Sequence, residues 1–317
     1  MLFSSAIMIG GGNMSTVKII GYEDWSVYNG FAEGSGRGEK LWLQSKFGEI
    51  GLFKFPKVDP LTLTSTTEYI SEHMSHQIGE IINVKTAKVD IGVRNQRIGC
   101  MSYLLNKPDE AIIEGADFII GKHPDYDTDE MKEKESGKYY SIEHLLEACE
   151  SHDEKQKIIQ MMLFDYLIGN SDRHQNNWAI LVKSDKRQKN FNERIFCPLY
   201  DNGSSLCSYV TDEQAKEILG KDKTRFEAIV NTKSRSMIRI DATSKNRPTH
   251  LEVAEYLLRQ YPEAKNIAFE FCSSLTMRQI ETLIEQYQDL ASENKLKLIK
   301  LFLVWKIEKL GILLNEV

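Results

Sequence analysis

The amino-acid sequence predicts a two-lobed α+β fold, in which a small antiparallel β lobe with one helix precedes a larger, mainly helical lobe. Short apolar runs separated by Gly-rich and polar turns fill the first part of the chain, as antiparallel strands do. From Ser141 onward, apolar residues follow helical spacing instead. We therefore expect the boundary near residue 106, with the first lobe over 14–106 and the second over 107–317.

The first lobe is expected to hold five strands around one helix. Apolar residues at helical spacing and the lack of proline between residues 62 and 82 predict the helix, which follows the third strand. The polar stretch 122–139 is expected to be a surface loop, and 250–313 to form amphipathic helices that complete the core of the larger lobe. The expected strands cover residues 16–21, 39–44, 49–55, 84–91 and 97–105.

Composition narrows the class of protein. At 317 residues and 41% apolar content the chain can bury a substantial core, and its net charge of −6 argues against a broad nucleic-acid footprint. No window reaches about 18 consecutive apolar residues, so a membrane span is not expected. Five cysteines without a CxxC pair suit the reducing cytoplasm, and the histidines show no metal-ligand spacing beyond His73 and His76 on the expected helix. We hypothesise that Met14 is the natural start and that residues 1–13 are a non-native or disordered extension.

The most informative stretch is residues 169–178, which read GNSDRHQNNW after an apolar helix. Asp172 and Asn177 are five residues apart, the separation of the catalytic Asp and the metal-binding Asn in a kinase catalytic loop. Asp172 is therefore the expected base for a substrate hydroxyl, and Asn177 an expected Mg²⁺ ligand. His174 is expected to orient this loop or to contribute directly. An Asp-Arg-His triplet alone would also suit an ordinary turn held by an ion pair.

A second acidic turn follows about thirty residues later. Asp201 comes after the apolar run IFCPLY, interpreted as a strand, and before the turn dipeptide Asn-Gly. At this place in the chain it is expected to bind Mg²⁺ that bridges the β- and γ-phosphates. The polar run 183–194 is expected to be a hairpin tip between the two acidic sites.

Lys54 is a charged residue in an otherwise apolar strand, so something must stabilise it there. In a kinase such a Lys holds the α- and β-phosphates and pairs with a Glu of the next helix, for which Glu68 is the first candidate. A snorkelling edge lysine is the alternative for Lys54 alone. Upstream, the Gly-rich hairpin 30–40 is expected to approach phosphates with its backbone, and Arg37 or Lys40 to add charge. The expected phosphate-loop residues are Gly34, Ser35, Gly36 and Gly38.

Taken in order, these motifs resemble the HipA-like serine/threonine kinases, in particular the compact, CtkA-like members, whose fold resembles that of phosphatidylinositol 3/4-kinases. GNSDRHQNNW is similar to the family's GNxDRHxxNW catalytic loop, and YDNGSSL to its metal-binding FDxGxxL turn. FKFP and TEYISEHM are similar to the family's nucleotide-binding strand and helix start. The match places Asp172 at the base position, Asn177 and Asp201 at metal positions, and Lys54 and Glu68 at the nucleotide.

The resemblance implies further expectations. The adenine base would meet backbone groups of the hinge strand, at Met101, Tyr103 and Leu104. Ser35 lies where HipA toxins autophosphorylate. Full-length toxins of toxin–antitoxin systems carry a further N-terminal subdomain for which this chain has no room, so an antitoxin-like partner stays open.

The expected activity is ATP- and Mg²⁺-dependent phosphoryl transfer to Ser or Thr of a protein, with no direct nucleic-acid partner. Two alternatives remain at this stage. One is a kinase of a small alcohol or a phosphoinositide, which the DRHxxN motif does not exclude. The other is a nucleotide-binding pseudokinase or regulator.

Overall fold

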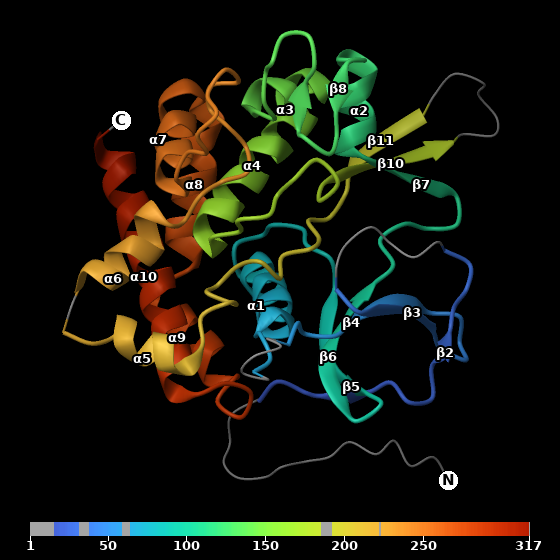
Figure 1. Ribbon diagram of the computed structural model, residues 1–317, viewed down its shortest axis with the longest axis vertical. Coiled ribbons are helices and arrows are strands. Elements are labelled where there is room, and N and C mark those ends of the chain that lie inside the picture. Colours follow the sequence, from blue (N-terminus) through green and yellow to red (C-terminus); the bar gives the residue numbers. More distant parts are fainter. Residues whose placement is uncertain (1–15, 32–37, 59–63, 185–191, 222, 317) are drawn as a thin grey trace.

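The computed structural model describes residues 16–31, 38–58, 64–184, 192–221 and 223–316. A six-stranded sheet forms the first part of the chain, in the order β1-β5-β6-β4-β3-β2 (Figure 1). The expected strands are all present in part, and the two-residue β2 is additional. The strands are β1 (Ile20–Gly21), β2 (Ser26–Val27), β3 (Lys40–Gln44), β4 (Ile50–Lys54), β5 (Val89–Arg94) and β6 (Arg97–Tyr103).

The sheet differs from the expected antiparallel sheet at one edge, where β1 pairs with β5 in parallel. Strand β5 is also shorter than expected, because residues 85–87 leave the sheet to pair with the second half of the chain. The N–H of Ala87 donates to the carbonyl of Leu199 at 2.8 Å, and the N–H of Leu199 donates to the carbonyl of Lys85 at 2.9 Å. These bonds connect the sheet to the segment that leads to Asp201.

One helix, α1 (Glu68–Ile81), packs against the sheet. It begins six residues later than expected, because Ser65 still forms an antiparallel bridge with Val58. Ile70, Met74 and Ile78 recur at helical spacing, and all three side chains are buried. Glu72 and His73 are buried on the same helix, which is unusual for charged and titratable side chains.

The central helix of the second half is α4 (His152–Ile168), whose residues 161–168 are all buried. Its N-terminus is capped by Ser151, whose hydroxyl accepts from the N–H of Glu154. Around it lie α2 (Gly115–Lys122), α3 (Ile142–Ala148), α7 (His250–Gln260), α8 (Pro262–Ser274) and α10 (Glu293–Glu316) (Figure 1). The expected amphipathic helices of the final segment are confirmed, with α9 (Met277–Glu285) as the fourth.

A three-stranded sheet, β11-β10-β7, lies beside α4, with β7 (Glu110–Glu114), β10 (Ala179–Ser184) and β11 (Asn192–Phe196). Strands β10 and β11 pair in antiparallel fashion, as the expected hairpin over 183–194 requires. Strand β7 was not expected. The stretch 122–139 is not a plain surface loop either, since it holds the hairpin β8 (Tyr126–Asp127) and β9 (Lys132–Glu133) and buries Tyr126 and Glu133.

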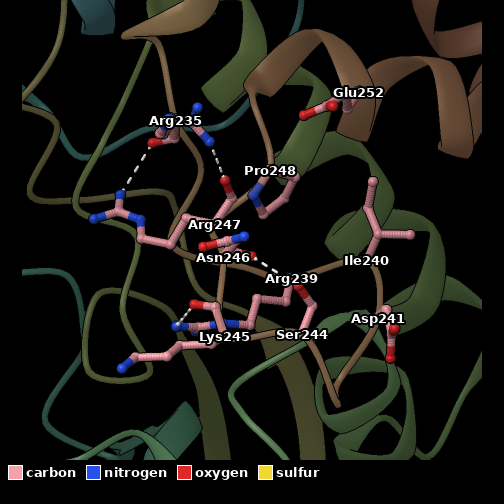
Figure 2. A pocket seen from close by; sticks show the side chains of 10 residues that line it. All are labelled: Arg235, Arg239, Ile240, Asp241, Ser244, Lys245, Asn246, Arg247, Pro248 and Glu252. Carbon is pink, nitrogen blue, oxygen red and sulfur yellow. Dashed lines mark hydrogen bonds between the residues drawn. The ribbon is translucent and has the colours of Figure 1, made fainter.

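The remaining elements, α5 (Asp212–Ile218), α6 (Lys223–Glu227) and the π-helical turn η1 (Ala228–Thr232), pack near α10. Residues 233–249 then run irregularly to α7 and line a pocket (Figure 2). Every helix in the described ranges is too short or too polar to cross a bilayer. All five cysteines are free thiols.

Candidate active site

The loop that carries Asp172 leaves the buried end of α4 through Gly169. Gly169 adopts a left-handed conformation, with φ of 69°, which ends the helix. A Cβ at this position would lie 2.7 Å from the ring of Phe302 in α10, so both the conformation and the space require glycine. The loop therefore starts from a fixed point in the core.

Arg173, the middle residue of the Asp-Arg-His triplet, is 1% exposed and holds the loop together. Its guanidinium donates to the carboxylate of Asp165 in α4, with a shortest distance of 2.8 Å. It also donates to the carbonyl of Asn177 at 2.7 Å, to that of Tyr200 at 2.8 Å, and to Oδ1 of Asn202 at 2.7 Å. One buried side chain thus fixes both the catalytic loop and the second acidic turn.

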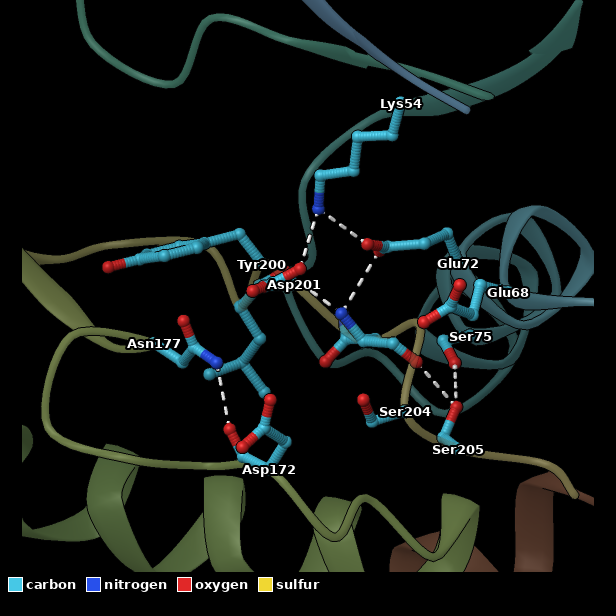
Figure 3. A network of polar contacts seen from close by, with 12 residues as sticks. Lys54, Glu68, Glu72, Ser75, Asp172, Asn177, Tyr200, Asp201, Ser204 and Ser205 are labelled. Atoms are coloured by element: carbon cyan, nitrogen blue, oxygen red, sulfur yellow. Dashed lines mark hydrogen bonds and ion pairs between the residues drawn. The ribbon is translucent and has the colours of Figure 1, made fainter. Parts of the chain in front are cut away.

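Asp172 and Asn177 face a common space (Figure 3). Nδ2 of Asn177 donates to the main-chain carbonyl of Asp172 at 2.7 Å, which leaves its amide oxygen for another partner. The N–H of Asp172 donates to Oδ1 of Asn170 at 3.0 Å. The loop geometry therefore fixes the amide of Asn177 against the backbone of Asp172 and leaves its oxygen available.

The electrostatic surroundings of Asp172 favour proton uptake. Burial raises the pKa of its carboxyl, and the negative charge of Asp201 raises it further, while the positive charge of His174 opposes both. His174 belongs to the same loop, and its Nδ1 accepts from the N–H of Asn176 at 3.2 Å. A neutral ring, whose Nδ1 accepts this bond, therefore shapes the loop, whereas a protonated ring lowers the pKa of Asp172.

The end of the loop is anchored by Trp178, which is 1% exposed. Its Nε1 donates to the hydroxyl of Tyr140 at 3.0 Å, and its ring lies so close to Gly115 that a Cβ there would come within 2.0 Å. Tyr140 precedes α3 and Gly115 opens α2. Two parts of the helical half therefore fix the position of this loop.

Asp201 lies on a turn rather than directly at the end of a strand, because β11 ends at Phe196. Its φ of 56° is in the left-handed region, which is uncommon for a residue with a Cβ. The carboxylate accepts from Nζ of Lys54 at 2.7 Å. The charge of Lys54, and more weakly that of Arg173, hold the pKa of Asp201 well below its usual range.

Lys54 also donates to Oε1 of Glu72 at 2.6 Å, so it lies between two carboxylates (Figure 3). Burial opposes its charge, but the two carboxylates outweigh burial and raise the pKa of Lys54. The second oxygen of Glu72 accepts from the N–H of Asn202 at 3.0 Å. Glu72 thus joins β4, α1 and the Asp201 turn.

The expectation that Glu68 pairs with Lys54 is wrong. Glu68 is the first residue of α1, and its carboxylate turns back to accept from Lys57 at 2.9 Å, from Thr66 at 2.8 Å and from Tyr209 at 2.7 Å. Residues four apart share a helix face, so Glu72 lies on the same side one turn further along, level with Lys54. Both residues belong to TEYISEHM, and the shift by one turn follows from the late start of the helix.

Of the expected phosphate-loop residues, Gly34, Ser35 and Gly36, like Arg37, lie outside the described residues. Gly38 is described and leads into β3, where Lys40 is paired with Lys54 of β4 in the antiparallel register. The chain that follows the Gly-rich segment is therefore adjacent to the Lys54 site. The positions of these glycines relative to a phosphate stay a prediction.

Comparisons with known proteins agree with this arrangement. The family profile described as HipA-like C-terminal domain matches residues 35–276, which is more than half of the chain. The chain belongs to this HipA-like family. A relative named serine/threonine-protein kinase CtkA, from Helicobacter pylori, is 24% identical over 247 residues, which cover 72% of this chain and 70% of that protein.

A solved structure shows the same fold. The crystal structure of the Helicobacter pylori proinflammatory kinase CtkA matches with a TM-score of 0.77 and 18% identity, over 94% of this chain and 99% of that chain. HipA of Shewanella oneidensis, solved with HipB and operator DNA, matches with a TM-score of 0.48 and 15% identity, over 96% of this chain and 67% of that chain. The family profile confirms the expected HipA-like family, and the CtkA structure confirms the two-lobed kinase-like α+β fold.

In this HipA-like chain, the expectation that backbone groups of Met101 meet the adenine base needs correction. Met101 lies in the middle of β6, between Phe53 of β4 and Asp90 of β5, and its side chain is fully buried. The backbone N–H and C=O of Met101 therefore take part in the hydrogen bonding of the sheet. The N–H of Tyr103 donates to the carbonyl of Lys88, and the N–H of Leu104 donates to the carbonyl of Ile50. An adenine base at this edge would therefore have to meet the carbonyls of Tyr103 and Leu104, or groups beyond them.

A basic pocket adjoins the catalytic loop of this HipA-like chain, and sequence analysis did not identify it. Arg247 donates to the carbonyl of Ser171, next to Asp172, at 2.8 Å, and Asp172 is among the charges that act on it. Arg235 and Arg239 line the same hollow, which has a volume of about 910 Å³ (Figure 2). Burial and these two neighbouring arginines lower the pKa of Arg247. The pocket therefore concentrates positive charge beside Asp172.

Proposed function

We propose that this HipA-like protein is an ATP- and Mg²⁺-dependent kinase that transfers the γ-phosphate to Ser or Thr hydroxyls of a protein. One observation carries the proposal, which is the position of Lys54 between Glu72 and Asp201, next to the Asp172–Asn177 loop. Protein kinases use the same set for phosphoryl transfer, namely a lysine paired with a glutamate, a metal-binding aspartate, and a loop with a catalytic aspartate and a metal-binding asparagine. The relative named serine/threonine-protein kinase supports the type of acceptor.

The residues present fit both cofactors. Asp201 is held ionised by Lys54, and the amide nitrogen of Asn177 is engaged, so each has an oxygen suited to a hard cation. These two side chains would hold Mg²⁺, which neutralises phosphate charge when bound. Lys54 would hold phosphate oxygens, and Glu72 would keep it in place.

The chemistry that remains for the chain is orientation and proton transfer. Asp172 accepts the proton of the acceptor hydroxyl as that oxygen attacks, and its raised pKa makes the carboxylate a better base than an exposed Asp. Arg173 keeps Asp172, Asn177 and the Asp201 turn in one register. Catalysis is then mainly positioning and electrostatic stabilisation.

The basic pocket suits an acceptor segment that carries acidic or phosphorylated residues next to its hydroxyl. Arg235 and Arg239 line the hollow that begins beside Ser171, together with Lys245 and Arg247, so its basic residues outnumber the two acidic ones, Asp241 and Glu252. The same charge favours one second candidate, a phosphoinositide acceptor, because its phosphates would be attracted equally. Autophosphorylation at Ser35 stays part of the proposal, and so does a cytoplasmic location, which five free thiols fit.

The test is transfer of labelled γ-phosphate from ATP. We expect label in protein, on Ser or Thr, with the wild type and with the exposed control Asp289→Asn, and no label above background with Asp172→Asn. Label in phosphoinositide vesicles but not in protein would support the second candidate. Equal labelling by wild type and Asp172→Asn would refute the catalytic assignment. Peptide mapping of the autophosphorylated chain tests Ser35.

A further inference from the structure

A cluster of two histidines and one glutamate lies away from the kinase site, where the β8–β9 hairpin meets α2 and α3. His123 caps the C-terminus of α2, Glu133 belongs to β9, and His144 lies in α3. One ligand atom from each residue lies within 4.8 Å of the other two. The three residues are ten or eleven positions apart in the chain and on separate elements, so no sequence spacing identifies them.

The three side chains converge on one oxygen. Oε1 of Glu133 lies 3.0 Å from Nδ1 of His123 and 2.9 Å from Nε2 of His144. His144 is 1% exposed and Glu133 is 6% exposed, while His123 is half-buried. The point at which they meet is therefore largely screened from water.

The outward-facing atoms of the same side chains are also held. Nε2 of His123 lies 2.8 Å from Oε2 of Glu147, and Nδ1 of His144 lies 2.8 Å from Oγ of Ser141. The second oxygen of Glu133 accepts from the hydroxyl of Ser136. Metal-binding histidines characteristically donate their second ring N–H to a carboxylate or another oxygen, which directs the free nitrogen lone pair at the metal. Both histidines have this arrangement.

We propose that His123 Nδ1, Glu133 Oε1 and His144 Nε2 bind a divalent transition-metal ion, Zn²⁺ in the first place, with a water as fourth ligand. Two imidazoles and one carboxylate match the nitrogen and oxygen donors that Zn²⁺ accepts, whereas Mg²⁺ and Ca²⁺ prefer oxygen alone. Tetrahedral Zn²⁺ separates its N and O ligands by about 3.3 Å. The contacts of 2.9 and 3.0 Å would widen by only a few tenths of an ångström.

The ion would have a structural role with a route to the kinase site. It would join β9 to α2 and α3, and so fix the β8–β9 hairpin. Between these strands, the carbonyl of Thr128 accepts from Nε2 of Gln175 in the catalytic loop at 2.8 Å. Tyr126, whose ring lies 5.6 Å from that of His144, has a buried hydroxyl without a partner among the described residues. The site thus supports, through Gln175, the loop that carries Asp172.

The experiment uses the full chain, freed of metal by dialysis against a chelator and then titrated with Zn²⁺ without ATP. We expect one Zn²⁺ per chain by competition with a chromophoric chelator, and a rise of the melting temperature by about 5 °C at a hundredfold excess over Kd. Co²⁺ should give a visible absorption band typical of four ligands, and millimolar Mg²⁺ should not compete.

Variants decide where the ion binds. His123→Gln, at the half-buried position, should lose the Zn²⁺ and the melting shift, and Glu147→Gln should weaken binding about 10- to 100-fold. The exposed His152→Gln is the matched control and should bind as wild type. Wild-type protein that takes up no Zn²⁺, or His123→Gln that binds it with unchanged affinity, would overturn the proposal. Because none of these readouts needs phosphoryl transfer, a failed kinase assay leaves them intact.

Discussion

Nζ of Lys54 lies 2.6 Å from Oε1 of Glu72, a carboxylate one helical turn beyond the first acidic residue of α1. Glu72 is 4% exposed, and its other oxygen accepts from the backbone of Asn202, next to Asp201. The pair therefore couples the position of α1 to both Lys54, the proposed phosphate-binding residue, and the acidic turn. Displacement of α1 would break these contacts together.

Replacing Glu72 should consequently cost far more activity than replacing Glu68. Glu72→Gln removes the charge that holds Lys54, and we expect kcat/KM for ATP to fall about 100-fold, as for other misplaced catalytic groups. Glu68→Gln is the matched control, since Glu68 contacts Lys57 and Tyr209 instead, and should stay within about threefold of wild type. Steady-state kinetics of both variants checks this. A larger loss in Glu68→Gln would restore the pairing that the sequence suggested.

The acid limb of the pH–rate profile should report Asp172. The base must be ionised, and burial raises its pKa, so kcat/KM should fall with decreasing pH at values above those of an ordinary aspartate. The positive charge of His174 lowers this pKa, so His174→Gln should move the acid limb to higher pH. The profile from pH 4 to 8 measures the shift, with His152→Gln as control. A limb that stays in place would show that the charge of His174 does not act on Asp172.

Much of the site follows from short sequence motifs. The residues of GNSDRHQNNW are brought together because one helix end and one buried arginine fix them, and both features lie within or beside the motif. The choice between Glu68 and Glu72 depends on where α1 begins. The bridge between Val58 and Ser65 decides that boundary, and strand ends are poorly marked in a single sequence.

Other features depend on contacts between distant segments. The parallel pairing of β1 with β5 involves two residues of β1, too few for a periodic signal. Met101 could be assigned to a strand, but not to its centre, without knowing that β4 and β5 flank it. The arginines of the basic pocket lie in an irregular segment whose path next to Ser171 is set by tertiary contacts.

Arg173 should be essential for the stability of the fold as well as for the position of the Asp172–Asn177 loop. Arg173→Met leaves Asp165 buried without its cationic partner, so we expect the free energy of unfolding to fall by about 3–5 kcal/mol. Adding Asp165→Leu should recover part of that stability but not phosphoryl transfer, because Asn177 and Tyr200 would still lack their donor. Urea unfolding and kinase assays on both variants measure this. Arg225→Met, which breaks an exposed pair with Glu217, is the control and should cost at most about 1 kcal/mol.

The basic pocket should determine which acceptors are used. Arg235→Gln combined with Arg239→Gln removes two charges from the hollow but leaves the Lys54–Asp201 contact in place, so KM for an acidic Ser/Thr peptide should rise about tenfold. KM for ATP and kcat should change little. The exposed Arg278→Gln changes net charge outside the pocket and serves as control. Because pocket charges are partly screened by salt, the difference should shrink in about 0.5 M NaCl. An unchanged peptide KM, or an equal rise with Arg278→Gln, would mean that the acceptor binds elsewhere.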